Sequence, residues 1–218
     1  MSYQKTESHD EYLKIVERYK DYEAGTYESM TLKEKMDFLD GVHTENIPLF
    51  DEDGDDMDTA DDYYSIRDEF LEQPEQFSLN DILSFLEMLD DSCCQPSFME
   101  TITKIIHNIV RHYQQEGVVF LFSNLNKVPE KGIRFGLFVN IYLLIKDDMT
   151  YQFINDAIGS VPSDTVGLIH KILSGKDMPE VPEKDGQTGR FPVFDECGDE
   201  TVLERKRELE KMILPLLT

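Results

Sequence analysis

The residues that could do chemistry are concentrated in the stretch DEDGDDMDTADD, residues 51–62, which holds eight carboxylates and no basic side chain. Carboxylate oxygens can ligate calcium, and an EF-hand loop needs acidic ligands at positions 1, 3 and 5, glycine at position 6 and glutamate at position 12. Counted from Asp51, Gly54 falls at position 4, and position 12 is Asp62, whose side chain is shorter than that of glutamate. The spacing therefore does not predict a specific calcium loop, and no metal or other cofactor is expected.

Two other interpretations of this stretch remain open. Like charges at this density repel one another and extend, which is typical of a disordered spacer. The flanking sequences, NIPLF before it and YYSIRDEFLEQ after it, are instead rich in apolar and aromatic residues. An acidic loop held between packed segments would suit recognition of a basic protein, because carboxylates pair with lysine and arginine while aromatic rings supply contact area. The candidate partner-binding residues are Asp51, Glu52, Asp53, Asp55, Asp56, Asp58, Asp61, Asp62, Tyr63 and Tyr64.

The rest of the chain contains no catalytic motif. His107 and His112 lie five residues apart and no HExxH sequence is present, so a zinc protease site is not predicted. The three cysteines, Cys93, Cys94 and Cys197, form no CxxC pair that would begin a zinc cage. Phosphate-binding, dinucleotide-binding and GxSxG sequences are also absent. These observations predict a binding protein and not an enzyme, with one alternative left open: an enzyme whose scattered carboxylates assemble around a metal.

Net charge indicates the kind of partner. The chain carries a formal charge of −24, and residues 1–100 account for most of it, with 28 acidic and 7 basic residues. Such a field repels nucleic acid and anionic membranes and attracts basic partners at rates that depend on salt. We therefore expect a basic protein partner, no nucleic acid and no membrane; solubility alone is the other explanation of the charge.

The cysteines and the apolar runs predict the cellular compartment and whether the chain spans a membrane. An odd number of cysteines, two of them adjacent, does not suit a disulfide framework and fits a reducing cytosol. The N-terminal sequence MSYQKTESHDEYL has no apolar core, and the longest apolar run, FGLFVNIYLLI at 135–145, is too short to span a bilayer. The expected location is the cytoplasm.

Helix signals recur along the whole chain. A first helix is expected from about Asp10 to Glu23. Capping-box pairs predict helix starts at three places: Thr31 with Glu34, Ser97 with Glu100, and Thr201 with Glu204. In SFMETITKIIHNIVRHYQQ, apolar residues recur every three or four positions, which predicts a helix with one buried face.

A period of 33 residues follows the prolines of the second half. Pro96, Pro129 and Pro162 are evenly spaced, and each precedes an apolar helical pattern. Apolar residues keep the same period in two further columns, one of Ile102, Phe135 and Leu168 and one of Ile106, Val139 and Ile172. Paired helices at this period are the size of an α-solenoid unit, whose apolar faces must be buried against neighbours. The alternative is that GVVFLF (117–122) and FVNIYLLI (138–145) form buried strands, since they are rich in β-branched and aromatic residues.

The predicted fold class is all-α, with helical hairpins stacked as a short HEAT-like α-solenoid behind an acidic N-terminal helical region. Three segments are expected: residues 1–75 with the acidic loop 51–62, residues 76–175 with the 33-residue hairpin repeats, and residues 176–218 with a long loop and a C-terminal helix. The loop assignment follows from the proline and glycine content of residues 175–199.

Residues 77–175, from FSLNDILSFLEMLDD to DTVGLIHKILSG, together with the acidic surplus upstream, resemble the all-helical, HEAT-like immunity proteins of bacterial polymorphic toxin and contact-dependent growth inhibition systems. The resemblance rests on architecture and charge and carries over no contact residue. It implies a cytoplasmic protein that binds one cognate toxin domain, expected to be a basic nuclease-type domain, and occludes its active site. A general α-solenoid scaffold or adaptor is the alternative.

Overall fold

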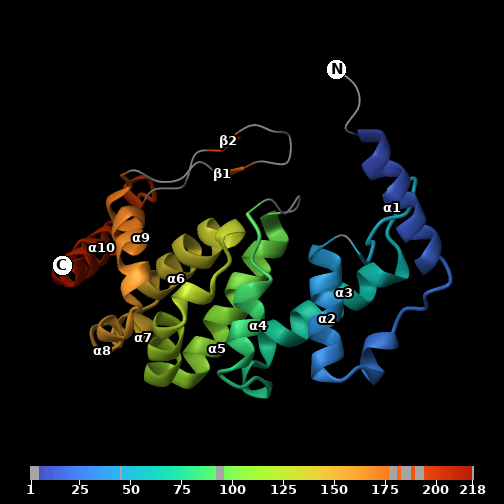
Figure 1. Ribbon diagram of the computed structural model, residues 1–218. Helices are drawn as coiled ribbons and strands as arrows, with labels where there is room; N and C mark the ends of the chain where they lie inside the picture. The colour runs from blue at the N-terminus through green and yellow to red at the C-terminus, as the bar shows by residue number, and fades with distance from the viewer. Residues whose placement is uncertain are drawn as a thin grey trace. The chain divides into compact units, whose positions relative to one another are not determined.

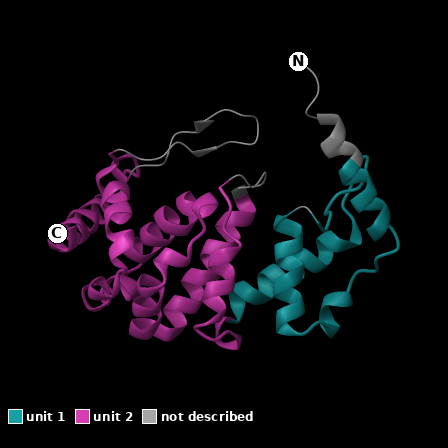
Figure 2. Cartoon of the chain, viewed as in Figure 1, with its two compact units in different colours: residues 1–73 teal, residues 74–218 magenta. Residues whose placement is uncertain are grey.

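The computed structural model describes residues 5–44, 46–91, 96–176, 181–182, 188–189 and 194–217, and the side chains of 11–44, 46–91, 97–176 and 194–217. The described residues are almost entirely helical (Figure 1), so the all-α prediction is confirmed. The chain divides into two compact units, Met1–Gln73 and Pro74–Thr218 (Figure 2). The predicted first segment ends at residue 75, two residues beyond unit 1, and the predicted third segment, residues 176–218, belongs to unit 2.

Unit 1 contains α1 (Lys5–Tyr19), the 3-10 turn η1 (Thr26–Ser29), α2 (Leu32–His43) and α3 (Asp58–Glu72). The capping box predicted at Thr31 is confirmed: its hydroxyl accepts from Glu34 N, and the Glu34 carboxylate accepts from Thr31 N. Helix α2 packs on α3. The apolar side chains that meet there are fully buried; they include Leu39, Ile66 and Phe70.

Unit 2 contains the remaining elements. Its α-helices are α4 (Asp81–Glu87), α5 (Pro96–Ser123), α6 (Asn140–Lys146), α7 (Asp148–Tyr151), α8 (Ile154–Ala157), α9 (Ser163–Ser174) and α10 (Glu200–Ile213). Short 3-10 segments are η2 (Pro74–Gln76), η3 (Leu125–Lys127), η4 (Glu130–Gly132), η6 (Ile158–Ser160), η7 (Phe194–Glu196) and η8 (Leu214–Leu217), and η5 (Arg134–Val139) is a π-helix. Helix α5 lies beside α4 and α6 (Figure 1) and also contacts α7 and α8, whereas α10 packs on α6 and α9.

Helix α5 is itself a hairpin. Gln114 interrupts it with φ 51° and ψ −124°, a backbone conformation that reverses the chain and that non-glycine residues rarely adopt. The two arms then approach so closely that a Cβ on Gly117 would lie 2.8 Å from Val110 Cα. The second arm contains GVVFLF, and FVNIYLLI is helical as well, so the strand alternative is wrong for both segments.

The three periodic prolines stand at helix starts. Pro96 is the first residue of α5, Pro129 immediately precedes η4, and Pro162 immediately precedes α9. In the second apolar column, Ile106 and Ile172 are fully buried and Val139 is half-buried. Pro96 and Pro162 therefore stand at the starts of α-helices, whereas Pro129 stands before a 3-10 turn that is followed by the π-helix η5; the repeat itself stays a prediction.

Several predicted boundaries need correction. Helix α1 ends at Tyr19, four residues before the predicted end. Helix α5 already begins at Pro96, so Ser97 lies inside the helix and is not its cap. Asp199, and not Thr201, caps α10 by accepting from Thr201 N and Val202 N. These shifts leave the identity of each helix unchanged.

The segment predicted as a long loop is only partly described. Within it, β1 (Val181–Pro182) and β2 (Thr188–Gly189) pair antiparallel over two residues each. Phe194, at its end, is buried with its ring centroid 4.8 Å from that of Phe138. The loop therefore returns to the core of unit 2 at η7. Among the described helices, none is long and apolar enough to cross a membrane.

Candidate functional site

The first half of the acidic stretch folds as a closed turn. Phe50 and Asp56 form an isolated antiparallel bridge, and Met57 N donates to Leu49 O. Inside the turn, Asp51 Oδ1 accepts from the amides of Asp53 and Asp55, each at 2.9 Å. Gly54 supplies the positive φ of 88° that the reversal needs. This hydrogen-bonded turn favours the recognition-loop interpretation over the extended spacer.

The carboxylates of this turn point to solvent. Glu52, Asp53, Asp55, Asp56, Asp58 and Asp61 are exposed, and Asp51 is half-buried. We call these seven residues the acidic segment. Among the described residues, none of the seven pairs with a lysine, arginine or histidine. Because the charges are not neutralised within the described chain, they are free to attract an external cation.

The second half of the stretch is not a loop. Helix α3 begins at Asp58, so the predicted loop 51–62 ends at Met57. Two carboxylates, Asp58 and Asp61, lie in the first turn of α3, where negative charge is favourable because the helix dipole is positive at its N-terminus. Because of this favourable interaction, a run of acidic residues that suggested a loop can also begin a helix.

Two predicted contact residues are buried and cannot touch a rigid partner. Asp62 is 1% exposed and accepts from Tyr22 Oη at 2.6 Å, Gly25 N at 2.6 Å and Tyr27 N at 3.0 Å. Burial, followed by this bond to Asp62, raises the pKa of Tyr22. Asp62 thus fastens the turn before η1 to α3 and has a structural role.

Tyr63 is also 1% exposed, and its ring lies beside His43 and Tyr64. Tyr64 is different, because it is 39% exposed and Arg67 lies over its ring at 4.9 Å. Of the ten predicted residues, Tyr64 and the acidic segment remain available for contact.

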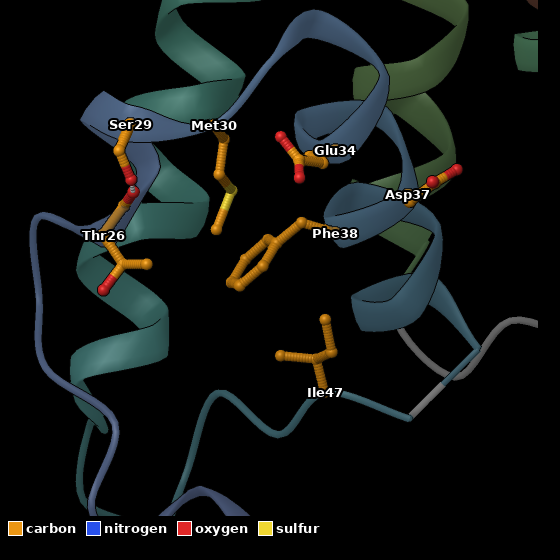
Figure 3. Close-up of a pocket in the computed structure, with 7 residues that line it drawn as sticks. All are labelled: Thr26, Ser29, Met30, Glu34, Asp37, Phe38 and Ile47. Atoms are coloured by element: carbon orange, nitrogen blue, oxygen red, sulfur yellow. Dashed lines mark hydrogen bonds between the residues drawn. The ribbon is translucent and has the colours of Figure 1, made fainter.

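A surface hollow in the same unit was not predicted. It is an open depression of about 430 Å³, lined by Thr26, Ser29, Met30, Glu34, Asp37, Phe38 and Ile47 (Figure 3). Apolar side chains form its floor, and carboxylates stand on the helix beside it. The sequence signal was the interleaving of acidic and apolar residues in KEKMDFLD, but the contribution of Ile47 depends on the chain turning back after α2.

His107 joins two helices of unit 2. His107 Nε2 lies 3.4 Å from Asp147 Oδ2, which Arg111 also contacts at 3.0 Å, and Asp147 caps α7. Burial lowers the pKa of His107, with Asp147 acting in the opposite direction. This group links α5 to the start of α7.

The described residues offer little for metal binding or cysteine chemistry. No three His, Cys, Asp or Glu side chains among the described residues are placed to hold a metal ion. Cys93 and Cys94 lie outside the described residues, and Cys197 is half-buried beside Asp199 O. The carboxylate-enzyme alternative therefore gains no geometric site here.

Comparisons with protein-family models, with curated proteins and with solved structures each returned no match. Function is therefore inferred from residues, charge and geometry.

Proposed function

We propose that this chain is a cytoplasmic binding protein that neutralises a basic partner protein, in the manner of an immunity protein that occludes a cognate nuclease toxin. The observation that carries the proposal is the acidic segment, a hydrogen-bonded turn and the first turn of α3, whose carboxylates have no basic partner among the described residues. A nuclease active site must bind phosphates and is therefore basic. Carboxylates held in a fixed turn can occupy such a cleft in place of the phosphates.

The distribution of charge supports fast capture of such a partner. Unit 1 holds 22 acidic and 7 basic residues, a net charge of −15, whereas the twice longer unit 2 has 23 and 14, a net charge of −9. A concentrated field of one sign steers an oppositely charged protein and raises its association rate, with strong salt dependence. Charge density therefore favours unit 1 as the recognition unit.

Unit 2 would then serve as a rigid helical body of the binding protein. Its proline-led helices at a 33-residue period, with α5 against α6 and α9 against η5, support a short HEAT-like stack of hairpins. A buried apolar core in such a stack gives a rigid body, which lowers the entropy cost of binding. This stacking is part of the proposal, as is the scaffold or adaptor role that a solenoid could serve instead.

The test uses the toxin domain encoded next to this chain's own gene. Co-expression of the full chain should restore growth to cells that produce this domain, and calorimetry should show tight one-to-one binding that weakens with added salt. A toxic neighbour that the chain neither binds nor neutralises would overturn the immunity proposal. Several weak partners and no toxic neighbour would favour the scaffold instead.

A further inference from the structure

The hollow of unit 1 combines an apolar floor with an acidic edge. The side chains of Met30, Phe38 and Ile47 converge on one space between η1 and α2 (Figure 3). Glu34 and Asp37, one helical turn apart on α2, are both exposed. The Glu34 carboxylate lies beside Phe38, whereas the Asp37 carboxylate points away from the three apolar side chains (Figure 3). The space of about 430 Å³ is largely open to solvent and is large enough to receive one long side chain along its apolar floor. An occupant must therefore be apolar along its length and positively charged at one end.

The hollow is built before any occupant arrives. The chain turns back after α2 because Asn46 N and Ile47 N both donate to Gly41 O, at 2.8 and 2.9 Å. Gly41 permits this approach, since a Cβ at that position would lie 2.7 Å from Ile47 Cδ1. On the opposite side, Ser29 Oγ donates to Thr26 O and closes η1. Both walls are thus fixed by backbone contacts, which lowers the cost of ordering on binding.

The edge carboxylates are charged and accessible. Glu34 Oε2 accepts from Thr31 N and Thr31 Oγ1, both at 2.8 Å, and these bonds lower the pKa of Glu34. Asp37 pairs with Lys33 at 2.7 Å, but the two side chains are 64% and 81% exposed. An exposed pair of this kind contributes little, so a partner's cation can replace Lys33.

We propose that this hollow receives an arginine side chain of the basic partner protein, with its methylene stem on Phe38 and Ile47 and its guanidinium beside Glu34, while Asp37 adds negative charge at the rim. Arginine is favoured over lysine because its guanidinium is planar, weakly hydrated and able to form two parallel hydrogen bonds with one carboxylate. Basic side chains routinely bury their stems and leave the charge at the edge. The inference deepens the proposed function, on which it rests, by naming the anchor residue that the partner must supply.

The first experiment needs no knowledge of the partner. The ¹⁵N-labelled full chain is titrated with acetyl-Gly-Arg-Gly-amide and with the same peptide carrying uncharged citrulline, and amide shifts are followed by NMR. The arginine peptide should shift the amides of Thr26, Ser29, Met30 and Ile47 and bind about tenfold more tightly than the citrulline peptide. Equal binding of the two peptides, or shifts outside these residues only, would overturn the proposal.

Matched variants test whether the carboxylates at the edge of the hollow cause the preference for arginine. Glu34→Gln with Asp37→Asn should abolish the preference for arginine, and glutamine at the third helical position can still serve the capping box. Ser29→Trp should block the hollow sterically without changing the charge. The control, Glu17→Gln with Asp21→Asn, removes the same charge from exposed positions outside the hollow and should bind like the wild type. A control that weakens binding as much as the edge variant would show that only total charge matters and would refute the site.

The second experiment separates this proposal from the proposed function. If the neighbouring toxin domain binds the wild-type chain, the edge variant should weaken binding about tenfold and the control less than twofold. Unchanged binding by the edge variant overturns the hollow as an anchor site and leaves the immunity function standing. If the wild-type chain does not bind the domain, the immunity function fails, and the peptide titration alone decides whether the hollow takes arginine.

Discussion

At the scale of single residues, neighbouring carboxylates in one run have opposite roles. Asp61 is exposed and Asp62 is buried with three donors around one carboxylate. Both were predicted as contact residues. The donors that bury Asp62 come from residues 22–27, more than thirty positions away. A contact at that separation leaves no local signal, whereas the Thr31 cap was predictable because both of its partners lie within four residues.

This difference gives a paired prediction. Asp62→Asn should lower the free energy of unfolding by about 2–4 kcal/mol, since it replaces charge-assisted bonds and turns an amide donor toward existing donors. Asp61→Asn, one residue away, should change it by less than about 0.5 kcal/mol. Urea denaturation followed by circular dichroism measures both. Equal effects of the two substitutions would contradict the structural role of Asp62.

A second residue-scale prediction concerns acid stability. Burial lowers the pKa of His43 to about 4, from an ordinary value near 6.5. Between these values the unfolded chain binds a proton that the folded chain does not, so the free energy of unfolding falls as the pH falls, by roughly 3 kcal/mol across the window. His43→Leu should flatten this dependence between pH 6.5 and 4. Urea denaturation of this variant and of the wild type at pH 6.5 and pH 4 measures the difference.

At the scale of elements, the helices were more predictable than the turns between them. Apolar periodicity identified α5 and α9, because burial of one face is written locally in the sequence. The reversal at Gln114 was not predicted, since glutamine carries no preference for its observed backbone conformation. Its only sequence signal is Gly117, which packing against Val110 requires. The start of α3 was missed because its acidic first turn also suits a loop.

The hairpin in α5 leads to opposite predictions for two small substitutions. Gly117→Ala should destabilise unit 2 by more than about 2 kcal/mol, because the new Cβ would overlap the Val110 backbone. Gln114→Gly should stabilise it by about 1 kcal/mol through relief of backbone strain. Gly167→Ala is the matched control, since this helical glycine has open space around it and alanine should stabilise α9 slightly. Thermal unfolding of the three variants distinguishes the cases, and a neutral Gly117→Ala would refute the close approach of the arms.

At the scale of the whole molecule, most of the net negative charge lies in unit 1, whereas most of the described helices lie in unit 2. The net charge of unit 1 could be read from the sequence, because counting needs no structure. The sequence could not show which carboxylates are exposed, because their exposure depends on where α3 begins and on which side chains it buries. The sequence thus predicts the class of partner, and the exposure of the side chains leaves the acidic segment, Tyr64 and the hollow as the candidate contact surfaces.

The last prediction tests whether this field acts through the acidic segment. Changing Asp51, Asp53, Asp55 and Asp56 together to asparagine keeps side-chain acceptors for the turn but removes four charges, so association with the basic toxin domain should slow by about tenfold or more at low salt, with a flatter salt dependence. The control makes the same charge change in unit 2, at the exposed residues Glu116, Glu130, Glu200 and Glu204, each changed to glutamine. Stopped-flow rates across a salt series measure both variants. Because long-range attraction depends on total charge while docking depends on position, equal slowing by the two variants would assign the effect to net charge and remove the acidic segment as the recognition surface.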